Sequence, residues 1–119
     1  MKLTIPRIPP SPNGTSGYLR LHWASRRKDK ATWKAEIELA LRSSGPAMLE
    51  LARTKVRVTV HQVRGRKLDR DNLWASVKNI VDAIVLCGLA VDDDDRWMDL
   101  HVTQETGKEH RTEITVEAS

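Results

Sequence analysis

The stretch KVRVTVHQV, residues 55–63, decides the fold because apolar and polar side chains alternate along it, with Val56, Val58 and Val60 on one face. Such alternation is typical of a strand that buries one face against a core. Residues 72–87 then carry apolar side chains at helical spacing, and Gly88 stands where that helix would end. A half-buried strand followed by an amphipathic helix is therefore predicted at the centre of the chain.

Weaker patterns on both sides of this unit complete the order of elements. Asp29 or Thr32 is expected to cap a first helix, because their side chains can accept hydrogen bonds from the first turn. The other expected elements are a strand near residues 3–5, a mobile loop at 11–17, a helix over 29–42, and two last strands over 97–104 and 112–116, joined by a turn around Gly107. This order predicts one α+β domain over residues 1–119, in which two main helices cover a small mixed sheet.

Size and charge narrow the function. The chain has 119 residues and a formal net charge of +4, which fits one domain and makes nucleic acid the leading partner. The single cysteine, Cys87, excludes an internal disulfide and is expected to be an inert, buried thiol in a reducing compartment. No run approaches the ~18 apolar residues of a membrane span, and the N-terminus lacks the apolar stretch of a signal peptide. A cytoplasmic protein without a membrane partner is expected.

Acidic residues are concentrated in one part of this basic chain. Residues 69–99 contain eight Asp against three Lys or Arg, a balance of −5, so the remainder, with 17 basic and 8 acidic residues, carries +9. Carboxylates repel nucleic-acid phosphates unless a divalent cation lies between them. Mg²⁺ prefers oxygen ligands and is usually shared between one or two carboxylates and a substrate phosphate. An acidic cluster inside a basic chain is what a metal-dependent nuclease would need.

Asp69 and Asp71 are two residues apart, between the predicted strand and the predicted helix. In extended backbone they would point to the same side and reach one cation, whereas either could instead be the N-cap of the helix. The four aspartates at 92–95 cannot cap the same helix. If a helix over 72–87 folds back on its sheet, its two ends lie roughly 24 Å apart. The second group must therefore return along the helix or be met by a partner chain, and the spacing leaves both open.

Lys78 occupies the helix face shared by Asp71, Ala75 and Asp82. Helical side chains lean toward the N-terminus, so the Lys78 ammonium would tilt toward Asp71 and could stabilise charge on a phosphate. The alternative is a surface salt bridge with Asp82 one turn later, and periodicity alone favours this alternative.

The sequence lacks the residues that other kinds of functional site would need. Four scattered histidines and one cysteine offer no zinc-ligand spacing, and no glycine-rich phosphate loop is present, so neither zinc nor a nucleotide cofactor is expected. Phe is absent and Tyr18 is the sole tyrosine, which excludes an RRM-type base-stacking platform. Trp23 and Trp74 remain candidates for base contacts. Basic runs at 26–28 and 64–67 are candidates for phosphate contacts, although a basic helix start is as often only solvated.

Taken together, these motifs resemble a known family. The chain is similar to the RusA family of Holliday junction resolvases in an ordered set of motifs: Ile8-Pro9-Pro10-Ser11-Pro12-Asn13, then Asp69-Arg70-Asp71-Asn72-Leu73, Lys78, Asp82-Ala83-Ile84, Gly88 and Asp92-Asp93. Family members are small, dimeric, Mg²⁺-dependent endodeoxyribonucleases, commonly carried by phages and prophages. The resemblance implies a RusA-like fold and a crossover junction endodeoxyribonuclease, which resolves four-way DNA junctions by paired symmetric nicks during recombination and repair.

The resemblance also implies roles for individual residues. The family's acidic trio would fall on Asp69, Asp71 and Asp93, with Asp92 as the neighbouring candidate, and these residues would hold Mg²⁺, with Mn²⁺ as a substitute. The catalytic lysine would fall on Lys78. A four-way junction has two-fold symmetry, so a homodimer could present one site to each of two opposed strands. Phosphates would be bound by Arg26, Arg27, Lys28, Arg64, Arg66 and Lys67.

Two other functions stay open, and the position of the lysine bears on the second of them. Lys78 lies seven residues after Asp71, whereas the best-studied type of the family has its lysine four residues on, where this chain has Ala75. One alternative is a less selective Mg²⁺-dependent nuclease for flaps and other branched DNA. The other is a branched-DNA-binding protein whose acidic site is weak or inactive in catalysis.

Overall fold

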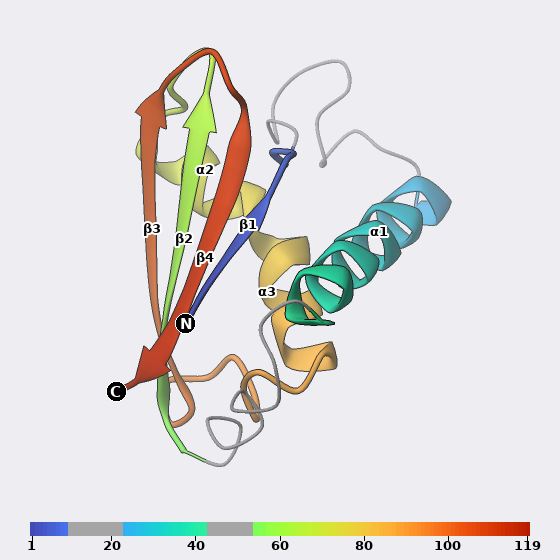
Figure 1. Cartoon of the computed structure of the whole chain (residues 1–119), viewed down its shortest axis with the longest axis vertical. Coiled ribbons are helices and arrows are strands. Elements are labelled where there is room, and N and C mark those ends of the chain that lie inside the picture. Colours follow the sequence, from blue (N-terminus) through green and yellow to red (C-terminus); the bar gives the residue numbers. More distant parts are fainter. Residues whose placement is uncertain (10–22, 43–53) are drawn as a thin grey trace.

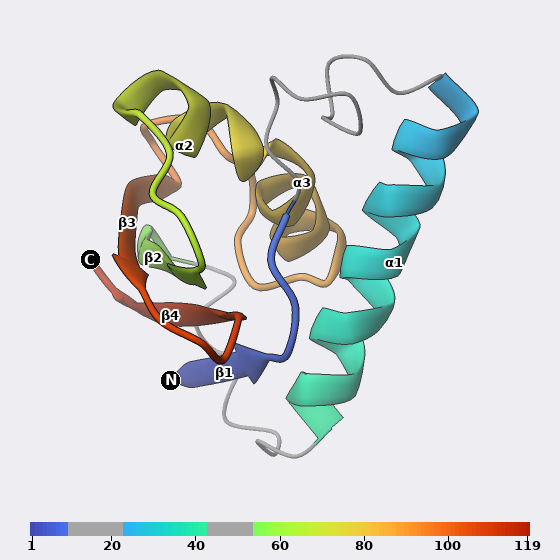
Figure 2. The ribbon, with the colours of Figure 1, turned by 90° about the horizontal axis from the view of Figure 1, so that it is seen from above.

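The expected α+β architecture is confirmed by the computed structural model, which describes residues 1–9, 23–42 and 54–119, and the side chains of the first helix from Arg27 onward. A four-stranded mixed sheet lies on one side and the helices cover one of its faces (Figures 1 and 2). The predicted mobile loop at 11–17 and the side chains of Trp23 and Arg26 lie outside the described residues.

The elements follow the predicted order. They are β1 (Lys2–Ile5), α1 (Trp23–Arg42), β2 (Val56–Arg64), α2 (Arg70–Ser76), α3 (Lys78–Leu86), β3 (Met98–Thr106) and β4 (Arg111–Ala118). The strands lie in the order β1-β4-β2-β3, so β2 separates the two last strands, which are consecutive in sequence. β2 runs antiparallel to β4 and parallel to β3.

The parallel pairing of β2 with β3 governs the layout of the chain. Val56 pairs with Met98 at one end of the two strands and Arg64 with Thr106 at the other. The chain must therefore cross from the end of β2 back to the start of β3, and α2 and α3 form this crossover (Figure 1). The nine paired residues span eight steps of about 3.3 Å, which separates the two ends of the crossover by roughly 26 Å.

The core lies between the sheet and the helices. The valines of β2 that were predicted to share one face are completely buried, as are Trp33 and Ile37 of α1 and Ile80 and Ile84 of α3. Figure 2 shows α1 beside α3 on the same side of the sheet. Cys87 packs at the edge of this core and is only partly buried; burial and the nearby Glu38 raise the pKa of its thiol, which keeps it protonated.

The first helix begins earlier than predicted. α1 starts at Trp23, so Asp29 and Thr32 lie inside it and the expected cap at either residue is wrong. The Thr32 hydroxyl donates to the carbonyl of Lys28 one turn back, at 2.9 Å, and Asp29 accepts a hydrogen bond from Asn79 of α3 at 2.7 Å. The basic run before Asp29 consists of good helix formers, which extend the helix without an apolar pattern.

The single helix predicted over residues 72–87 is two helices. Val77 interrupts it with φ −93° and ψ 2°, and its N–H bonds back only three residues, to Trp74 at 3.4 Å. The buried Ser76 hydroxyl donates to the carbonyl of Leu73 at 2.7 Å, which competes with the regular helical bonds at this point. α2 and α3 therefore have separate directions, and face relationships that assume one straight helix do not hold across Val77.

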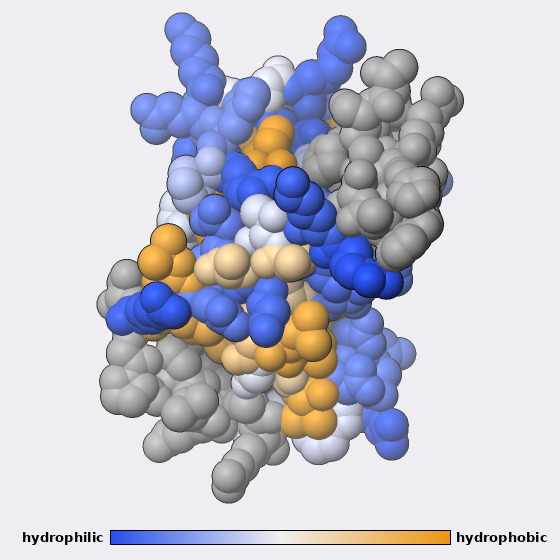
Figure 3. Space-filling model, turned by 90° about the vertical axis from the view of Figure 1, so that its right-hand side faces the viewer, coloured by the Kyte–Doolittle hydropathy of each residue, from blue (hydrophilic) through white to orange (hydrophobic). Residues whose placement is uncertain are grey.

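The outer surface of α1 and α3 is mainly hydrophilic. Figure 3 shows the α1 side of the molecule, where an apolar band interrupts a largely polar surface. Leu39 of α1 and Leu86 of α3 are the most exposed large apolar side chains described, at 60% and 59%. In the part of the chain that is described, no helix is both long and apolar enough to cross a membrane.

Gly88 ends α3 as predicted, with a left-handed φ of 79°, and the N–H of Leu89 reaches the carbonyl of Ile84 at 3.1 Å. No heavy atom would crowd an added Cβ, so the cost of substitution is backbone strain alone. Gly88→Ala should lower the free energy of unfolding by about 1 kcal/mol in urea titrations, and Gly88→Asn by less, since Asn tolerates this conformation better. Equal stability of Gly88→Ala and the native chain would contradict this backbone role.

Candidate metal and nucleic-acid site

Asp69 is the N-cap of α2. Its carboxylate accepts the backbone N–H of Asn72 at 2.9 Å through Oδ1 and the side-chain amide of Asn72 at 3.1 Å through Oδ2. The prediction that Asp69 could be the N-cap of the helix is therefore confirmed. Asp71 lies in the first turn of α2 and is exposed. Because Asp71 is helical, the argument that extended backbone points both carboxylates to one side does not apply.

The turn before Asp69 is fixed to the sheet by polar side chains. Gln104 of β3 accepts the N–H of Leu68 at 3.0 Å and donates to the carbonyl of Leu68 at 2.7 Å. Its register partner on β2, Gln62, is completely buried and donates to the hydroxyl of Ser76 at 3.0 Å. Two glutamines on neighbouring strands thus hold the two ends of α2.

Arg64 belongs to this internal network. It is 7% exposed, and its Nη1 donates to the side-chain oxygen of Gln62 at 2.7 Å and to the carbonyl of Pro9 at 2.9 Å. Burial lowers the pKa of its guanidinium. Arg64 thus joins β2 to the proline-containing N-terminal segment, and this internal position does not offer it as a surface contact for phosphate.

The second acidic group lies in the loop after α3. The N–H of Asp93 donates to Asp92 at 2.7 Å, and hydrogen bonding with Asp92, burial and the charges of Asp92 and Asp82 together raise the pKa of Asp93. The aspartates Asp92, Asp93 and Asp82 line a surface hollow of about 330 Å³ with Lys30, Val85 and Leu86. The next residue, Asp94, turns the chain into β3 by accepting the backbone N–H of Arg96 at 3.0 Å.

The two acidic groups do not meet within one subunit. Asp69 follows the end of β2, whereas Asp92 and Asp93 precede the start of β3, so they belong to opposite ends of the crossover (Figure 1). The loop after α3 returns along that helix to the neighbourhood of Asp82, but a return as far as Asp69 is not observed. Asp93 instead shares the hollow with Asp82 of α3. Residue spacing in the sequence does not predict this proximity, because it depends on how the loop folds back on α3.

Lys78 is the first residue of α3 and is exposed. The salt bridge with Asp82 that periodicity favoured is wrong, because Asp82 pairs with Lys30 of α1 at 3.0 Å. Within residues 1–9, 27–42 and 54–119, Lys78 makes no ion pair with a carboxylate. The helix break at Val77 also removes the assumption that Lys78 and Asp71 share one face.

The other basic residues assigned to phosphate binding lie on two surfaces. Arg27 and Lys28 are exposed on α1, and Arg66 and Lys67 are exposed in the turn between β2 and α2. Only Leu68 separates the second pair from Asp69, so positive charge flanks the acidic start of α2 on the same segment.

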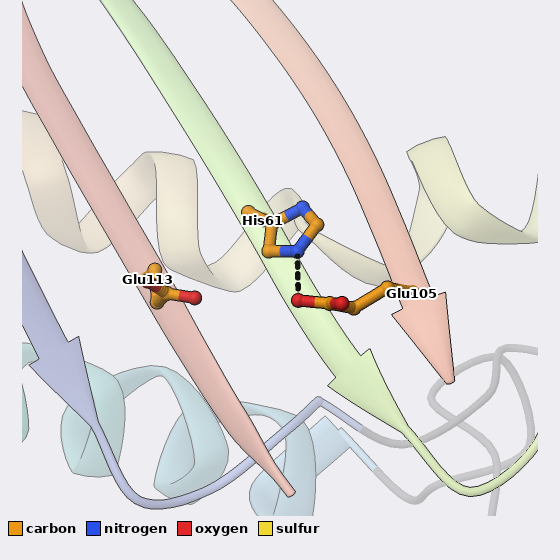
Figure 4. Close-up of side chains that lie close together, drawn as sticks. All are labelled: His61, Glu105 and Glu113. Carbon is orange, nitrogen blue, oxygen red and sulfur yellow. Dashed lines mark hydrogen bonds and ion pairs between the residues drawn. The ribbon is translucent and has the colours of Figure 1, made fainter. Parts of the chain in front are cut away.

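A second group of potential ligands lies on the open face of the sheet. The ligand atoms of His61, Glu105 and Glu113 lie within 4.8 Å of one another (Figure 4). His61 Nε2 is 3.0 Å from Glu105, while Glu113 pairs with Lys2 and, at 3.4 Å, with Arg111. These residues are distant in sequence and meet only through strand register, so ligand spacing could not reveal them. Because two cations already compensate Glu113, the contacts are those of cross-strand ion pairs.

No protein-family model matches the chain, and no curated protein matches it.

Glu113 gives the open face a pH dependence. Hydrogen bonding from Lys2, followed by the charges of Lys2, Arg111 and His61, lowers its pKa despite some burial. Its contribution to stability is therefore present above the ordinary Glu pKa and is lost as pH falls through the lowered value. Glu113→Gln should destabilise by up to about 1 kcal/mol at neutral pH, and the deficit should shrink at about pH 3 in urea titrations.

Glu117 provides the matched control, since it lies four residues further along the same face of β4 and is exposed. Glu117→Gln should leave the stability unchanged at both pH values. A pH-independent deficit in Glu113→Gln would show that its ion pairs do not contribute as described.

Proposed function

We propose that this protein is a Mg²⁺-dependent endodeoxyribonuclease that cuts four-way DNA junctions by paired nicks, as the resemblance to the RusA family implies. The observation that carries the proposal is the exposed carboxylate of Asp71 beside Asp69, flanked by exposed Arg66 and Lys67. Carboxylates that bind no cation would weaken contacts between these basic side chains and phosphate. A shared cation makes the two charge types compatible in one phosphate site.

The donor set suits Mg²⁺. Carboxylate oxygens are the hard ligands that Mg²⁺ prefers, and one or two of them suffice when water and substrate phosphate fill the remaining positions. Each Asp69 oxygen accepts one hydrogen bond from Asn72, and a carboxylate oxygen has a further lone pair for a cation. Asp71 is exposed at the first turn of the same helix. Asp69 and Asp71 would therefore hold the metal, with Mn²⁺ as a substitute.

When bound, the metal would activate a water molecule and neutralise charge that develops on the phosphate. Asn72 would orient the Asp69 carboxylate through its two hydrogen bonds. The ammonium of Lys78 would stabilise charge on the phosphate or on the leaving oxygen. Exposed Arg66 and Lys67, with Arg27 and Lys28 on α1, would bind the flanking phosphates.

The protein would act as a homodimer in which each metal site takes residues from both subunits. One subunit carries Asp69 and Asp71 at one end of the crossover and Asp92 and Asp93 at the other. A two-fold axis can bring one end of a subunit to the opposite end of its partner, and this arrangement generates two identical sites. Asp93 of the partner subunit, with Asp92 of the partner subunit beside it, would then complete each ligand set. Two such sites match the two opposed strands of a four-way junction.

A substrate comparison tests the activity. The protein is incubated with a four-way junction, a flap and a duplex, with and without Mg²⁺, and the products are separated on a denaturing gel. Symmetric nicks in the junction alone, dependent on Mg²⁺, are expected. Nicks of equal rate in the flap would favour the less selective nuclease, and binding without any nick would favour the inactive binding protein.

Asp71→Asn should abolish cleavage of the junction while preserving or tightening binding, because a charge that opposes phosphate is removed. Binding is measured by gel shift in the absence of Mg²⁺, and circular dichroism checks the fold. Loss of junction binding by a folded Asp71→Asn protein would contradict this role.

Substitutions of Asp69 separate its two roles. Asp69→Asn keeps a side-chain oxygen for the N-cap and should retain near-native stability, whereas Asp69→Ala should lose about 1 kcal/mol in urea unfolding. Both should lose Mg²⁺-dependent cleavage, because neither supplies a carboxylate. Cleavage by Asp69→Asn at the native rate would reduce Asp69 to a helix cap.

A further inference from the structure

One end of the helix-covered sheet face is polar, and α2 lies against it. Gln62 of β2 and Gln104 of β3 are register partners there, and both reach α2 or the residue before its cap. Apolar residues fill the corresponding positions at the other end of the same strands, where Val56 faces Met98. Core packing does not explain the polar side chains at this end, and their hydrogen bonds to α2 and to the residue before its cap do.

Gln104 makes an unusually complete contact with one peptide unit. Its amide accepts from the N–H of Leu68 at 3.0 Å and donates to the carbonyl of Leu68 at 2.7 Å. The contact is partly buried and spans 36 residues of sequence. A partly buried side-chain amide is costly unless its polar atoms are bonded. Both bonds point at the residue that directly precedes Asp69.

The two hydrogen bonds from Gln104 to Leu68 also restrain the carboxylate of Asp69. Asp69 directly follows Leu68, whose backbone Gln104 holds, and the Asp69 carbonyl accepts the N–H of Leu73 at 2.9 Å. On the other side, both carboxylate oxygens are bonded to Asn72. Asp69 is therefore fixed from the strand side by Gln104 and from the helix side by Asn72.

We propose that Gln104 is a positioning residue for the metal-binding carboxylates of Asp69 and Asp71. This role rests on the proposed function. Metal ligands must be held within about 0.5 Å of their working positions, and a surface turn does not reach that precision without support. The Gln104 amide supplies the support from the rigid sheet, and it contacts neither metal nor substrate.

Gln104→Met tests this role, because Met has a similar size and removes both hydrogen bonds to Leu68. The expected result has three parts. Amide hydrogen exchange at Leu68 and Asn72 becomes about tenfold faster, as the loss of one hydrogen bond allows. The affinity for Mn²⁺, measured by calorimetry on the whole protein, falls about fivefold to tenfold. The kcat for junction cleavage falls, while the KM for the junction stays within about twofold because the phosphate contacts are retained.

Gln62→Met is the matched comparison. It removes the bond from the neighbouring strand to Ser76 at the far end of α2 and the acceptor for Arg64, and Gln62 makes no bond to Leu68. It should leave amide exchange at Leu68 unchanged and the affinity for Mn²⁺ within about twofold. A purely structural role for Gln104 would lower the melting temperature in both variants without separating their Mn²⁺ affinities.

The outcomes distinguish this inference from the proposed function. Native exchange rates at Leu68 and Asn72 in Gln104→Met, or native Mn²⁺ affinity in that variant, would overturn the positioning role while the nuclease activity stands. A native protein that binds no Mn²⁺ and makes no nicks would overturn the proposed function, and the positioning role would fall with it.

Discussion

The parallel pairing of β2 with β3 is the constraint on which the rest of the structure depends. Parallel neighbours cannot be joined by a tight turn, so the chain between them must travel the full length of the sheet. That requirement makes α2 and α3 a crossover and lays α3 on the sheet, where α1 can pack against it. It also places Asp69, after β2, and Asp93, before β3, at opposite ends of the crossover.

The sheet face beneath the helices divides into two parts with different tasks. Its apolar part, formed around Val58 and Val60, supports α3 and stabilises the domain. Its polar end carries Gln62, Arg64 and Thr112, whose partners are the start of the chain and α2; Thr112, for example, donates to the carbonyl of Arg7 at 2.7 Å. The polar end therefore orients the N-terminal segment and the acidic start of α2 relative to one another. The open face carries cross-strand ion pairs.

The sequence predicts the elements well because each has a period of its own. The alternation over residues 55–63 and the apolar stripe before Gly88 are local signals, and both elements exist where they were expected. The break at Val77 and the early start of α1 were missed, since a serine hydroxyl bond and a run of good helix formers alter no hydrophobic period.

The candidate site could be predicted only in part. Asp69 and Asp71 are only two residues apart at the start of α2, so their proximity follows from the sequence, and the sequence also offered Asp69 as a helix cap. The position of Asp92 and Asp93 relative to Asp69 depends on the direction of β3 beside β2, and no local sequence pattern encodes that direction. Local patterns also could not predict three further features, because each arises from contacts between segments that are distant in sequence. These are the internal position of Arg64, the Lys30–Asp82 pair and the cluster around His61.

The central claim is that acidic groups separated within one subunit act together across a dimer, and heterodimers test it directly. Subunits with Asp71→Asn and with Asp93→Asn are co-expressed under different affinity tags, and the mixed dimer is purified through both tags. A site shared between subunits predicts one intact site in this mixed dimer and Mg²⁺-dependent nicking of a four-way junction at about half the native number of sites, although both mutant homodimers are inactive. A dimer of one native subunit and one subunit with both substitutions should then be inactive. Activity in that second dimer and none in the first would contradict the shared site.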